Sequence, residues 1–118
     1  MARFSVDGND LVLNLSGLEK LEGFHGDIRV PVAAVRDVRS TDDPWSELRG
    51  IRAPGTGMPG VIAVGTRRGG GIKDFAAVHG QGSAVVVELE GAEYGRLVVT
   101  EEDAESAAAD LKHQLGLG

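Results

Sequence analysis

Residues 96–115, "RLVVTEEDAESAAADLKHQL", change from a strand pattern to a helix pattern within one short segment. The apolar, β-branched run at 96–100 predicts a strand. The apolar residues that follow it at helical spacing are Ala104, Ala107, Ala108, Leu111 and Leu115. Because this face is rich in alanine, the helix can approach another layer closely. We therefore expect a sheet whose last strand leads into an amphipathic helix packed against it.

Capping and charged residues mark both ends of this helix. Thr100 is in position to cap the N-terminus, and the acidic side chains within 101–105 suit the positive end of the helix dipole. Lys112 and His113 complement the other end, and Gly116 is expected to stop the helix.

The N-terminal part of the chain predicts a hairpin followed by a short helix. Apolar runs at 3–6 and 11–15 flank an Asp-Gly-Asn-Asp turn. Ser16 and Glu19 have the spacing of a capping box, which predicts one or two helical turns over about 17–24. The apolar stripe of these turns consists of Leu18, Leu21 and Phe24.

Short strands are expected through most of the remaining chain. Because Pro31 cannot donate to a strand ladder, two strands near 27–31 and 34–39 are favoured over one. Residues 41–60 are expected to form a long irregular segment. The later strand-like runs are 61–66, 73–80 and 84–90, followed by the strand at 96–100. About seven short strands and a terminal helix predict a mainly β protein, either a small antiparallel barrel or a bent sandwich whose open end the helix covers.

Composition is consistent with one compact domain over residues 1–118, with no cysteine and a formal charge of −6. No apolar run approaches the roughly 20 residues that cross a bilayer. The N-terminus lacks the basic and then apolar pattern of a secretory signal. We therefore expect a cytoplasmic protein.

Three segments carry a resemblance to a known family. They are "LSGLEKLEGFHGDIRVPVAAVRDV" (15–38), "DDPWSELRGIRAPGTGMPGVIAVGTRRGGGIKDFAAV" (42–78) and the segment 96–115. In this order they resemble the bacterial pleckstrin-homology-like (PH-like) domains, and the middle segment resembles small stand-alone actinobacterial members. The resemblance implies a seven-stranded PH-like barrel with a C-terminal helix, serving as a binding or assembly scaffold with no catalytic residues.

Residues 55–60, "GTGMPG", spell the G-x-G-x-x-G string of dinucleotide-binding loops. Such a loop requires a helix after it, so that the pyrophosphate meets the helix N-terminus, whereas a strand pattern follows here. Pro59 also removes a backbone donor. We interpret the string as a Gly/Pro-rich connection between strands.

Other residue types that could perform chemistry lack partners at suitable spacing. The three histidines, which are His25, His79 and His113, lie on different predicted elements, and the chain contains no cysteine. They therefore do not predict a zinc site. Asp42–Asp43 are interpreted as the start of a turn. Ser83 has neither the spacing nor the strand-to-helix context of a nucleophile elbow. The sequence therefore predicts no enzyme, no metal and no cofactor.

Charge is distributed unevenly along the chain. Residues 49–73 carry +5 without any Asp or Glu, which leaves −11 for the rest of a chain whose total is −6. The candidate anion-binding residues are Arg49, Arg52, Arg67, Arg68 and Lys73. Either they form one anion-facing surface, or they point in different directions and pair with the surplus acids.

The sequence does not favour inositol phosphates or nucleic acid as ligands. The region where PH domains that bind lipids hold inositol phosphates corresponds to residues 16–27, where Lys20 is the one Lys or Arg among several acids. Nucleic acid is not expected, because the chain is acidic and poor in aromatic residues.

Two functions remain compatible with the sequence. The first is a non-catalytic binding or assembly module, acting through a protein partner or self-association, which the apolar run Val85–Val87 and the long loop 41–60 favour. Trp45 is expected to anchor that loop to the barrel. The alternative is a weak peripheral binder of anions or membrane surfaces through residues 49–73.

Overall fold

The computed structural model describes residues 2–23 and 26–117, except for the side chains of residues 52–54. Its strands are β1 (Arg3–Asp7), β2 (Asp10–Asn14), β3 (Ile28–Pro31), β4 (Val35–Thr41), β5 (Ile51–Met58), β6 (Ile62–Gly69), β7 (Ile72–His79), β8 (Ala84–Leu89) and β9 (Arg96–Thr100). Its helices are α1 (Gly17–Gly23), α2 (Ala104–Gln114) and the short 3-10 turns η1 (Val32–Ala34) and η2 (Pro44–Glu47).

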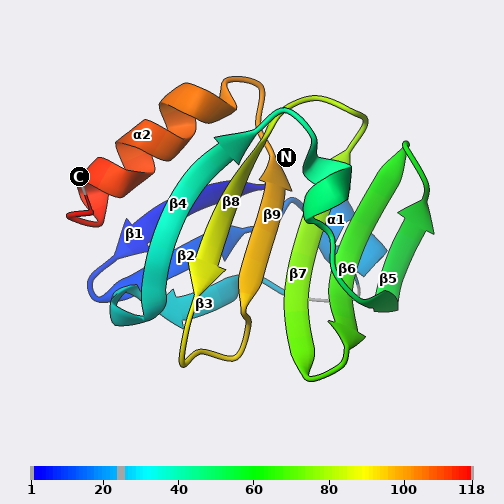
Figure 1. The fold of residues 1–118 in the computed structure, drawn as a ribbon, viewed down its shortest axis with the longest axis horizontal. Coiled ribbons are helices and arrows are strands. Elements are labelled where there is room, and N and C mark those ends of the chain that lie inside the picture. The colour runs from blue at the N-terminus through cyan, green and yellow to red at the C-terminus, as the bar shows by residue number, and fades with distance from the viewer. Residues whose placement is uncertain (1, 24–25, 118) are drawn as a thin grey trace.

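The strands form two separate sheets (Figure 1). The smaller sheet has the antiparallel order β1-β2-β3, and the larger has the order β4-β8-β9-β7-β6-β5. Within the larger sheet β7 and β9 are parallel, because β9 returns from the β8–β9 hairpin and inserts between β8 and β7. Among the described residues no ladder joins the two sheets, so the expected closed barrel of about seven antiparallel strands is corrected to an open arrangement of nine strands.

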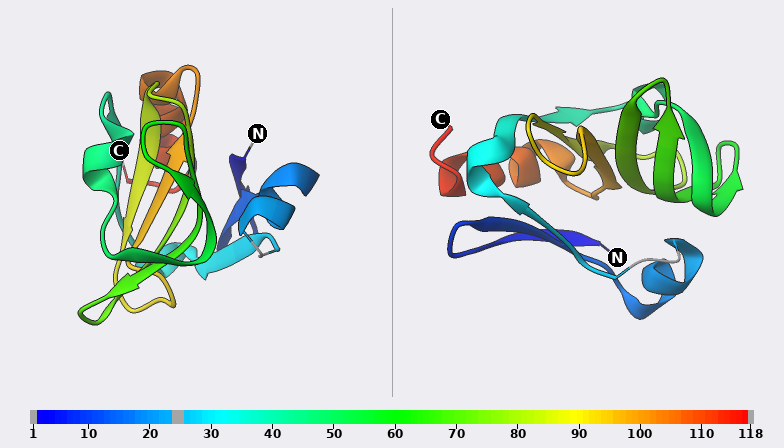
Figure 2. Two further views of the ribbon diagram at one scale, coloured as in Figure 1. Left: turned by 90° about the vertical axis from the view of Figure 1, so that its right-hand side faces the viewer. Right: turned by 90° about the horizontal axis from the view of Figure 1, so that it is seen from below.

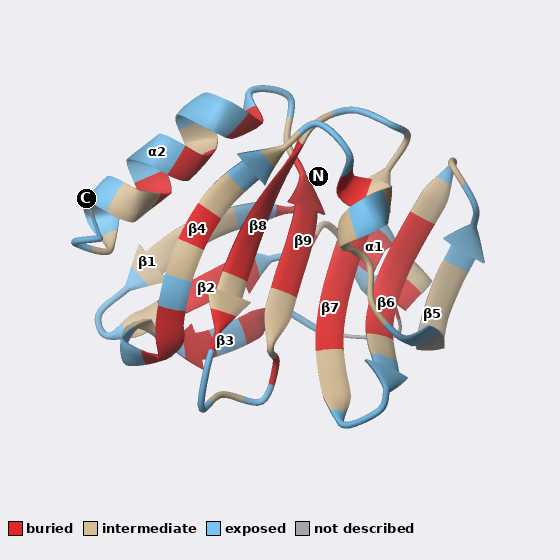
Figure 3. Cartoon of the chain, in the orientation of Figure 1, coloured by how far each residue is buried: buried red, intermediate tan, exposed pale blue. Residues whose placement is uncertain are grey.

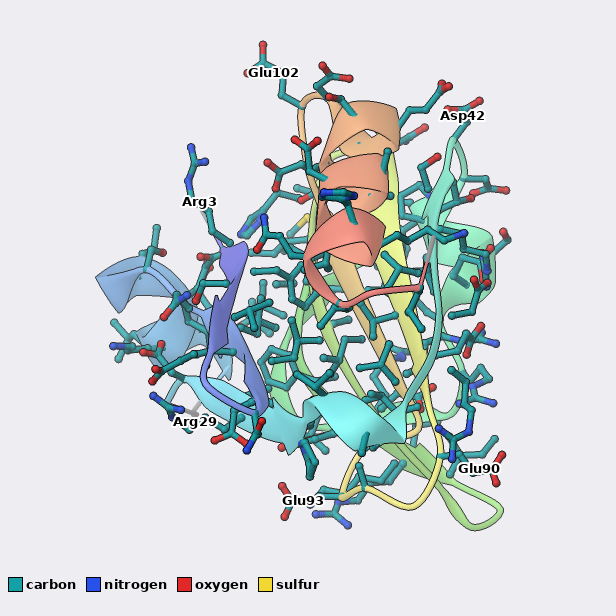
Figure 4. All side chains as sticks on the ribbon, turned by 90° about the vertical axis from the view of Figure 1, so that its left-hand side faces the viewer. Arg3, Arg29, Asp42, Glu90, Glu93 and Glu102 are labelled. Atoms are coloured by element: carbon teal, nitrogen blue, oxygen red, sulfur yellow. The ribbon has the colours of Figure 1, made fainter. Side chains whose placement is uncertain are left out.

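The two sheets face each other across the main hydrophobic core (Figure 2). Leu11, Leu13 and Val30 of the smaller sheet meet Phe75 and Leu97 of the larger one in this core. Burial is deepest along β7, β8 and β9, the central strands of the larger sheet (Figure 3). Charged side chains such as those of Arg29, Asp42 and Glu102 point away from the core (Figure 4).

The chain crosses from one sheet to the other at η1. Pro31 ends β3, and the Val32 amide donates to the carbonyl of Asn9 at 2.8 Å before β4 begins. This arrangement confirms the two strands that were expected on either side of Pro31.

Helix α2 closes one side of the space between the sheets and lies beside β4 (Figure 1). Ala104, Ala108 and Leu111 are buried in the main core, as the apolar face predicts. The helix ends before Gly116, whose φ is 72° and whose amide donates to the carbonyl of His113 at 3.1 Å. The predicted C-terminal stop is therefore confirmed.

The cap expected at Thr100 is wrong. Asp103 occupies the N-cap position, and α2 begins at Ala104. Thr100 belongs to β9, where its hydroxyl donates to the carbonyl of Ala77 at 3.3 Å and accepts from the amide of His79 at 3.2 Å. The hydroxyl thus joins β9 to β7. Three residues separate Thr100 from the start of α2, so Thr100 lies too early in the chain to cap the helix.

The capping box of α1 is confirmed, but its apolar stripe is not buried. The Ser16 amide donates to Glu19 Oε1 at 3.0 Å, and the Glu19 amide donates to Ser16 Oγ at 3.1 Å. Leu18 and Leu21 are 64% and 70% exposed, whereas Glu19 and Gly23 are buried. Phe24 lies outside the described residues. The small residue Gly23 lets α1 approach β6 and β7, since a Cβ there would lie 3.2 Å from the side chain of Val64.

The irregular segment expected over residues 41–60 is corrected to a 3-10 turn and an eight-residue strand. Residues 55–58 of the glycine string lie in β5, and Pro59 and Gly60 form the turn into β6. A strand follows the string, as predicted. The sequence did not predict the strand β5, because Gly and Pro have low strand propensity. The segment is extended because it pairs with β6.

The apolar run Val85–Val87, which favoured a binding or assembly module, is not on the surface. These residues belong to β8, which lies between β4 and β9, and each is at most 2% exposed. Their continuous apolar run reflects burial on both faces of a central strand.

Candidate binding cleft

Residues 44–50, which we call the strap, cross the larger sheet on the face that points away from the smaller sheet. The strap leads from β4 at one edge of the sheet to β5 at the other edge. Five inter-strand steps separate these edges, a distance of roughly 24 Å at the usual strand spacing. The turn η2 and the helix α1 lie on opposite faces of this sheet (Figure 2).

Trp45 anchors the strap to the sheet beneath it. Its indole Nε1 donates to the carbonyl of Gly80 at 2.8 Å. Trp45 and Leu48 pack against a second apolar cluster. The cluster consists of Ala63, Ala76, Val78, Ala84, Val86 and Val98. The strap is therefore fixed by apolar burial as well as by a hydrogen bond.

A network of two arginines and two glutamates clamps the next part of the strap. Arg39 of β4 donates to both carboxylate oxygens of Glu47, at 2.7 and 2.9 Å, and to Glu88 Oε2 at 2.9 Å. Arg96 donates to Glu88 Oε1 at 3.0 Å and to the main-chain carbonyl of Glu47 at 2.9 Å. These bidentate and bridging bonds hold η2 over β4, β8 and β9.

The network shifts the titration of its carboxylates. Hydrogen bonds from Arg39 lower the pKa of Glu47 below its ordinary value, although partial burial opposes them. Burial by itself would raise the pKa of Glu88, but hydrogen bonds from Arg96 and Arg39 outweigh it and lower this pKa as well. Both carboxylates are thus held in the charged form.

Two further arginines fasten the end of the strap. Arg49 Nε and Nη2 donate to the two carboxylate oxygens of the buried Asp74, at 2.7 and 2.8 Å, and the pKa of Arg49 rises in consequence. Arg67 of β6 donates to the carbonyls of Arg49 and Gly50 at 3.1 and 3.0 Å. The strap therefore reaches β5 in a defined conformation.

An open cleft of about 460 Å³ lies between the strap and the β5–β6 hairpin. Its lining is formed by Trp45, Leu48, Ile51, Gly57, Met58, Pro59, Ile62, Ala63 and Arg67. Ile51 and Met58 are 74% and 59% exposed, and the neighbouring Val61 is 55% exposed. Exposed aliphatic side chains thus border a largely apolar hollow with one cation in its wall.

The structure divides four of the five candidate anion-binding residues between the two faces of the larger sheet. Arg49 and Arg67 meet at the strap. Arg68 is exposed and follows Arg67 in β6, so it points to the opposite face. Lys73 also lies on that side, 3.3 Å from Glu93 Oε2 and 4.9 Å from the ring centroid of Tyr94. The side chain of Arg52 lies outside the described residues, and its backbone pairs with Arg67.

His79 lies between two carboxylates of α1. Its Nδ1 is 3.7 Å from Glu19 Oε2, and its Nε2 is 3.4 Å from Glu22 Oε1. The carboxylates face different ring nitrogens, so they hold α1 against the end of β7 rather than surround one point. Within residues 2–23 and 26–117, no group of three or more His, Cys, Asp or Glu side chains could hold a metal ion.

The other residues considered from sequence have local structural contacts. Asp43 accepts from the amide of Ser46 at 3.4 Å and begins η2, while Asp42 precedes it in an exposed bend. Ser83 Oγ donates to the carbonyl of Glu101 at 3.2 Å. His113 is exposed on α2, and His25 lies outside the described residues.

The cleft itself was not predicted from the sequence. Apart from Arg67, its walls come from 44–50 and 51–63, most of which was interpreted as irregular chain. The available signal was the spacing of Trp45, Leu48, Ile51 and Met58 across a Gly/Pro-rich segment, since apolar residues that recur in a loop require a surface to cover or to bind.

No helix in the described part of the chain is long and apolar enough to span a bilayer.

Comparison with family models, curated proteins and solved structures finds no match to this chain.

Proposed function

We propose that this protein is a non-catalytic binding module that holds a polypeptide partner in the cleft between the strap and β5. The proposal includes a PH-like scaffold, which the mainly β architecture, the two facing sheets and the C-terminal helix support. The cleft has one charged side chain in its lining, that of Arg67, which suits binding better than acid–base chemistry.

The observation that carries this proposal is the exposure of Ile51 and Met58 beside a rigidly fastened strap. Large aliphatic side chains at 74% and 59% exposure leave apolar area in water that a partner would remove. The hydrogen bonds of Trp45, Glu47 and Arg49 hold the opposite wall in place before any partner arrives. Preorganisation of this kind lowers the entropic cost of association.

Selection from a phage-displayed library of random peptides tests the proposal without assuming a ligand. We expect enriched peptides to bind the wild-type protein and to lose at least roughly tenfold in affinity for Met58→Asp, a loss of ~1.4 kcal/mol. Leu18→Asp is the matched control, because Leu18 is similarly exposed but lies on α1, on the opposite face of the sheet.

Enriched peptides that bind Met58→Asp as well as wild type would contradict the cleft as the binding surface. A selection that yields no specific peptide would contradict the proposed function itself. Both variants change an exposed side chain, so each is expected to keep the wild-type fold, which circular dichroism would check.

A further inference from the structure

We propose that the polypeptide partner is a second copy of this chain, and that two copies pair through the second half of β5, so that their larger sheets become one continuous sheet. This inference rests on the proposed function and names its partner. Three features of the described residues support it: the direction of the free backbone groups of β5, the symmetric register that these groups allow, and the absence of charge at the end of the β5–β6 hairpin.

Strand β5 ends the larger sheet and is the outermost element on its side of the molecule (Figure 1). It pairs with β6 alone in the described part of the chain, so its other side has backbone donors and acceptors available to another strand. At the opposite end of the sheet α2 lies beside β4. Strand addition at such an edge supplies main-chain hydrogen bonds between two chains.

Two glycines direct their backbone groups to this free edge. The carbonyl of Met58 accepts from the amide of Val61 at 2.9 Å in the turn to β6, so the backbone groups of Met58 face β6. Such groups alternate between the two sides of a strand, and the register of 55–58 with β6 is regular. Gly57 and Gly55 therefore present an amide and a carbonyl each to a second chain. Neither has a side chain that would hold a second backbone away.

Two prolines limit the length of edge that a second strand can use. Pro54 and Pro59 lack an amide hydrogen and flank the two glycines. A two-fold axis at Thr56 sets Gly55 of each copy opposite Gly57 of the other, and each such pair exchanges two main-chain hydrogen bonds. A shift of two residues toward the turn would instead set Gly55 opposite Pro59, which cannot donate. The backbone thus favours one symmetric register.

The same register covers apolar side chains that a single copy leaves in water. It brings the turn 58–61 of each copy to the Ile51 end of β5 in the other copy. The side chains of Ile51, Met58 and Val61 are each more than half exposed. Their removal from water favours association. Because Ile51 and Met58 line the cleft, the second copy lies along its rim.

The end of the β5–β6 hairpin has no charge that would repel a second copy. Residues 53–66 contain no Asp, Glu, Lys or Arg. Arg52 precedes the two-fold axis by four residues, so the backbones of the two Arg52 residues would lie roughly 25 Å apart, well beyond the Debye length of about 8 Å at physiological salt. The edge strand β1 differs, because Arg3 and Asp7 at its ends are charges of the kind that protect an edge from pairing.

Sedimentation equilibrium of the wild-type protein, over a dilution series from about 1 mM to about 1 µM, tests for the dimer. We expect a weak, reversible dimer, because an edge of this length gives a small interface. In Gly57→Pro the proline ring replaces the amide that faces the second copy, so the dissociation constant should rise at least roughly fivefold. Circular dichroism and thermal unfolding check that this variant keeps the wild-type fold.

Disulfide cross-linking tests the register, since the chain has no cysteine of its own. Thr56→Cys would place two thiols across the two-fold axis, where directly opposed Cα atoms lie about 4.5 Å apart, a separation that a disulfide can span. Ser5→Cys is the matched control, because Ser5 lies in β1, the edge strand of the smaller sheet. With oxidised glutathione as the oxidant, Thr56→Cys should form the linked dimer at least roughly tenfold faster than Ser5→Cys.

The outcomes distinguish this inference from the proposed function. A wild-type protein that stays monomeric at the highest concentration, or equal cross-linking rates for the two cysteine variants, would overturn the pairing of two β5 strands. If library selection still yielded peptides sensitive to Met58→Asp, the binding function would stand with a different polypeptide as its partner.

Discussion

Gly55 occupies the position where β5 shifts register against β6. Its φ is 149°, and a Cβ at this residue would collide with the carbonyl oxygen of Val64. Glycine is therefore required both for the backbone conformation and for the close contact of the two strands. Gly57 and Met58, which line the cleft, follow this residue in β5, so the geometry of the cleft depends on the absence of a side chain at Gly55.

Replacement of Gly55 by Ala should lower the free energy of unfolding by about 1–3 kcal/mol, because the strand must accept strain or separate from β6. Chemical denaturation followed by Trp45 fluorescence measures the change. Gly82→Ala is the control, since Gly82 has open space around its Cα and no positive φ. Equal stabilities of the two variants would show that β5 does not need the conformation described.

Among the elements, the strap is unusual because charged pairs as well as apolar contacts hold it. The side chains of Glu47 and Glu88 are 19% and 27% exposed, so water screens their bonds to Arg39 and Arg96 only in part. Hydrogen bonds to charged groups of this kind contribute ~1.5–3 kcal/mol when they are lost individually. The position of η2, and with it one wall of the cleft, should therefore depend on pH.

Acidification should loosen the strap. The pKa values of Glu47 and Glu88 are lowered in the folded state, so their contribution to stability is present above the ordinary value of 4.5 and is lost as pH falls through the lowered values. We expect the free energy of unfolding to decrease as pH falls below about 4.5, the range in which these two carboxylates take up protons. A Glu47→Gln/Glu88→Gln variant should be less stable near neutral pH and show a flatter pH dependence. Parallel curves for the two proteins would contradict this role.

Helix α2 stabilises the protein through its buried face. Leu111 is 4% exposed in the main core, and Leu111→Asp would bury a carboxylate without a partner, at a cost of roughly 3–5 kcal/mol. Thermal unfolding measures the loss. Ala109→Asp, at an exposed position of the same helix, should cost less than about 1 kcal/mol. Similar melting temperatures for both variants would mean that α2 does not close the core.

Elements with local signals were predictable from the sequence. The spacing of Ser16 and Glu19 and the apolar face of α2 depend on neighbours within one or two helical turns. The exposure of Leu18 was not predictable, because which face of α1 meets the sheet depends on the close approach of Gly23 to β6 and β7. Strand β5 was missed for a similar reason, since its extended form depends on pairing with β6 rather than on its own residues.

For the whole molecule, strand order and the cleft were the hardest features to predict. The insertion of β9 between β8 and β7 leaves no mark in the local pattern of any of these strands. The cleft unites residues of the strap, β5 and β6, and it exists only because the chain crosses the sheet between its two edges. The uneven charge of residues 49–73 was evident, but its division between two faces required the strand register.

Binding to anionic membranes should be weak, because Asp74 and Glu93 compensate Arg49 and Lys73, so at most three arginine charges of residues 49–73 can act on a bilayer. Because Arg67 and Arg68 point to opposite faces of the sheet, one bilayer cannot meet all of these charges, so at about 1 kcal/mol each they supply less than ~3 kcal/mol. We expect slight co-sedimentation with phosphatidylserine vesicles at low salt, less of it for Arg68→Ser, and none at physiological salt. Arg36→Ser, at an exposed position outside this stretch, is the control. Strong binding at physiological salt that Arg68→Ser abolishes would favour the membrane-surface function instead.

The crossing of the strap also limits how the length of this chain can vary. The connection from Thr41 to Ile51, with η2 as a 3-10 turn and the other residues fully extended, can span at most roughly 29 Å. The distance that it must cover between the outer strands β4 and β5 is roughly 24 Å. Deletion of two residues removes about 7 Å of reach, so β4 and β5 could no longer both keep their places. Insertions meet no such barrier, since doubling a loop costs only about 0.6 kcal/mol. Length variants of this segment that remain folded should therefore be longer than the chain described, and seldom shorter.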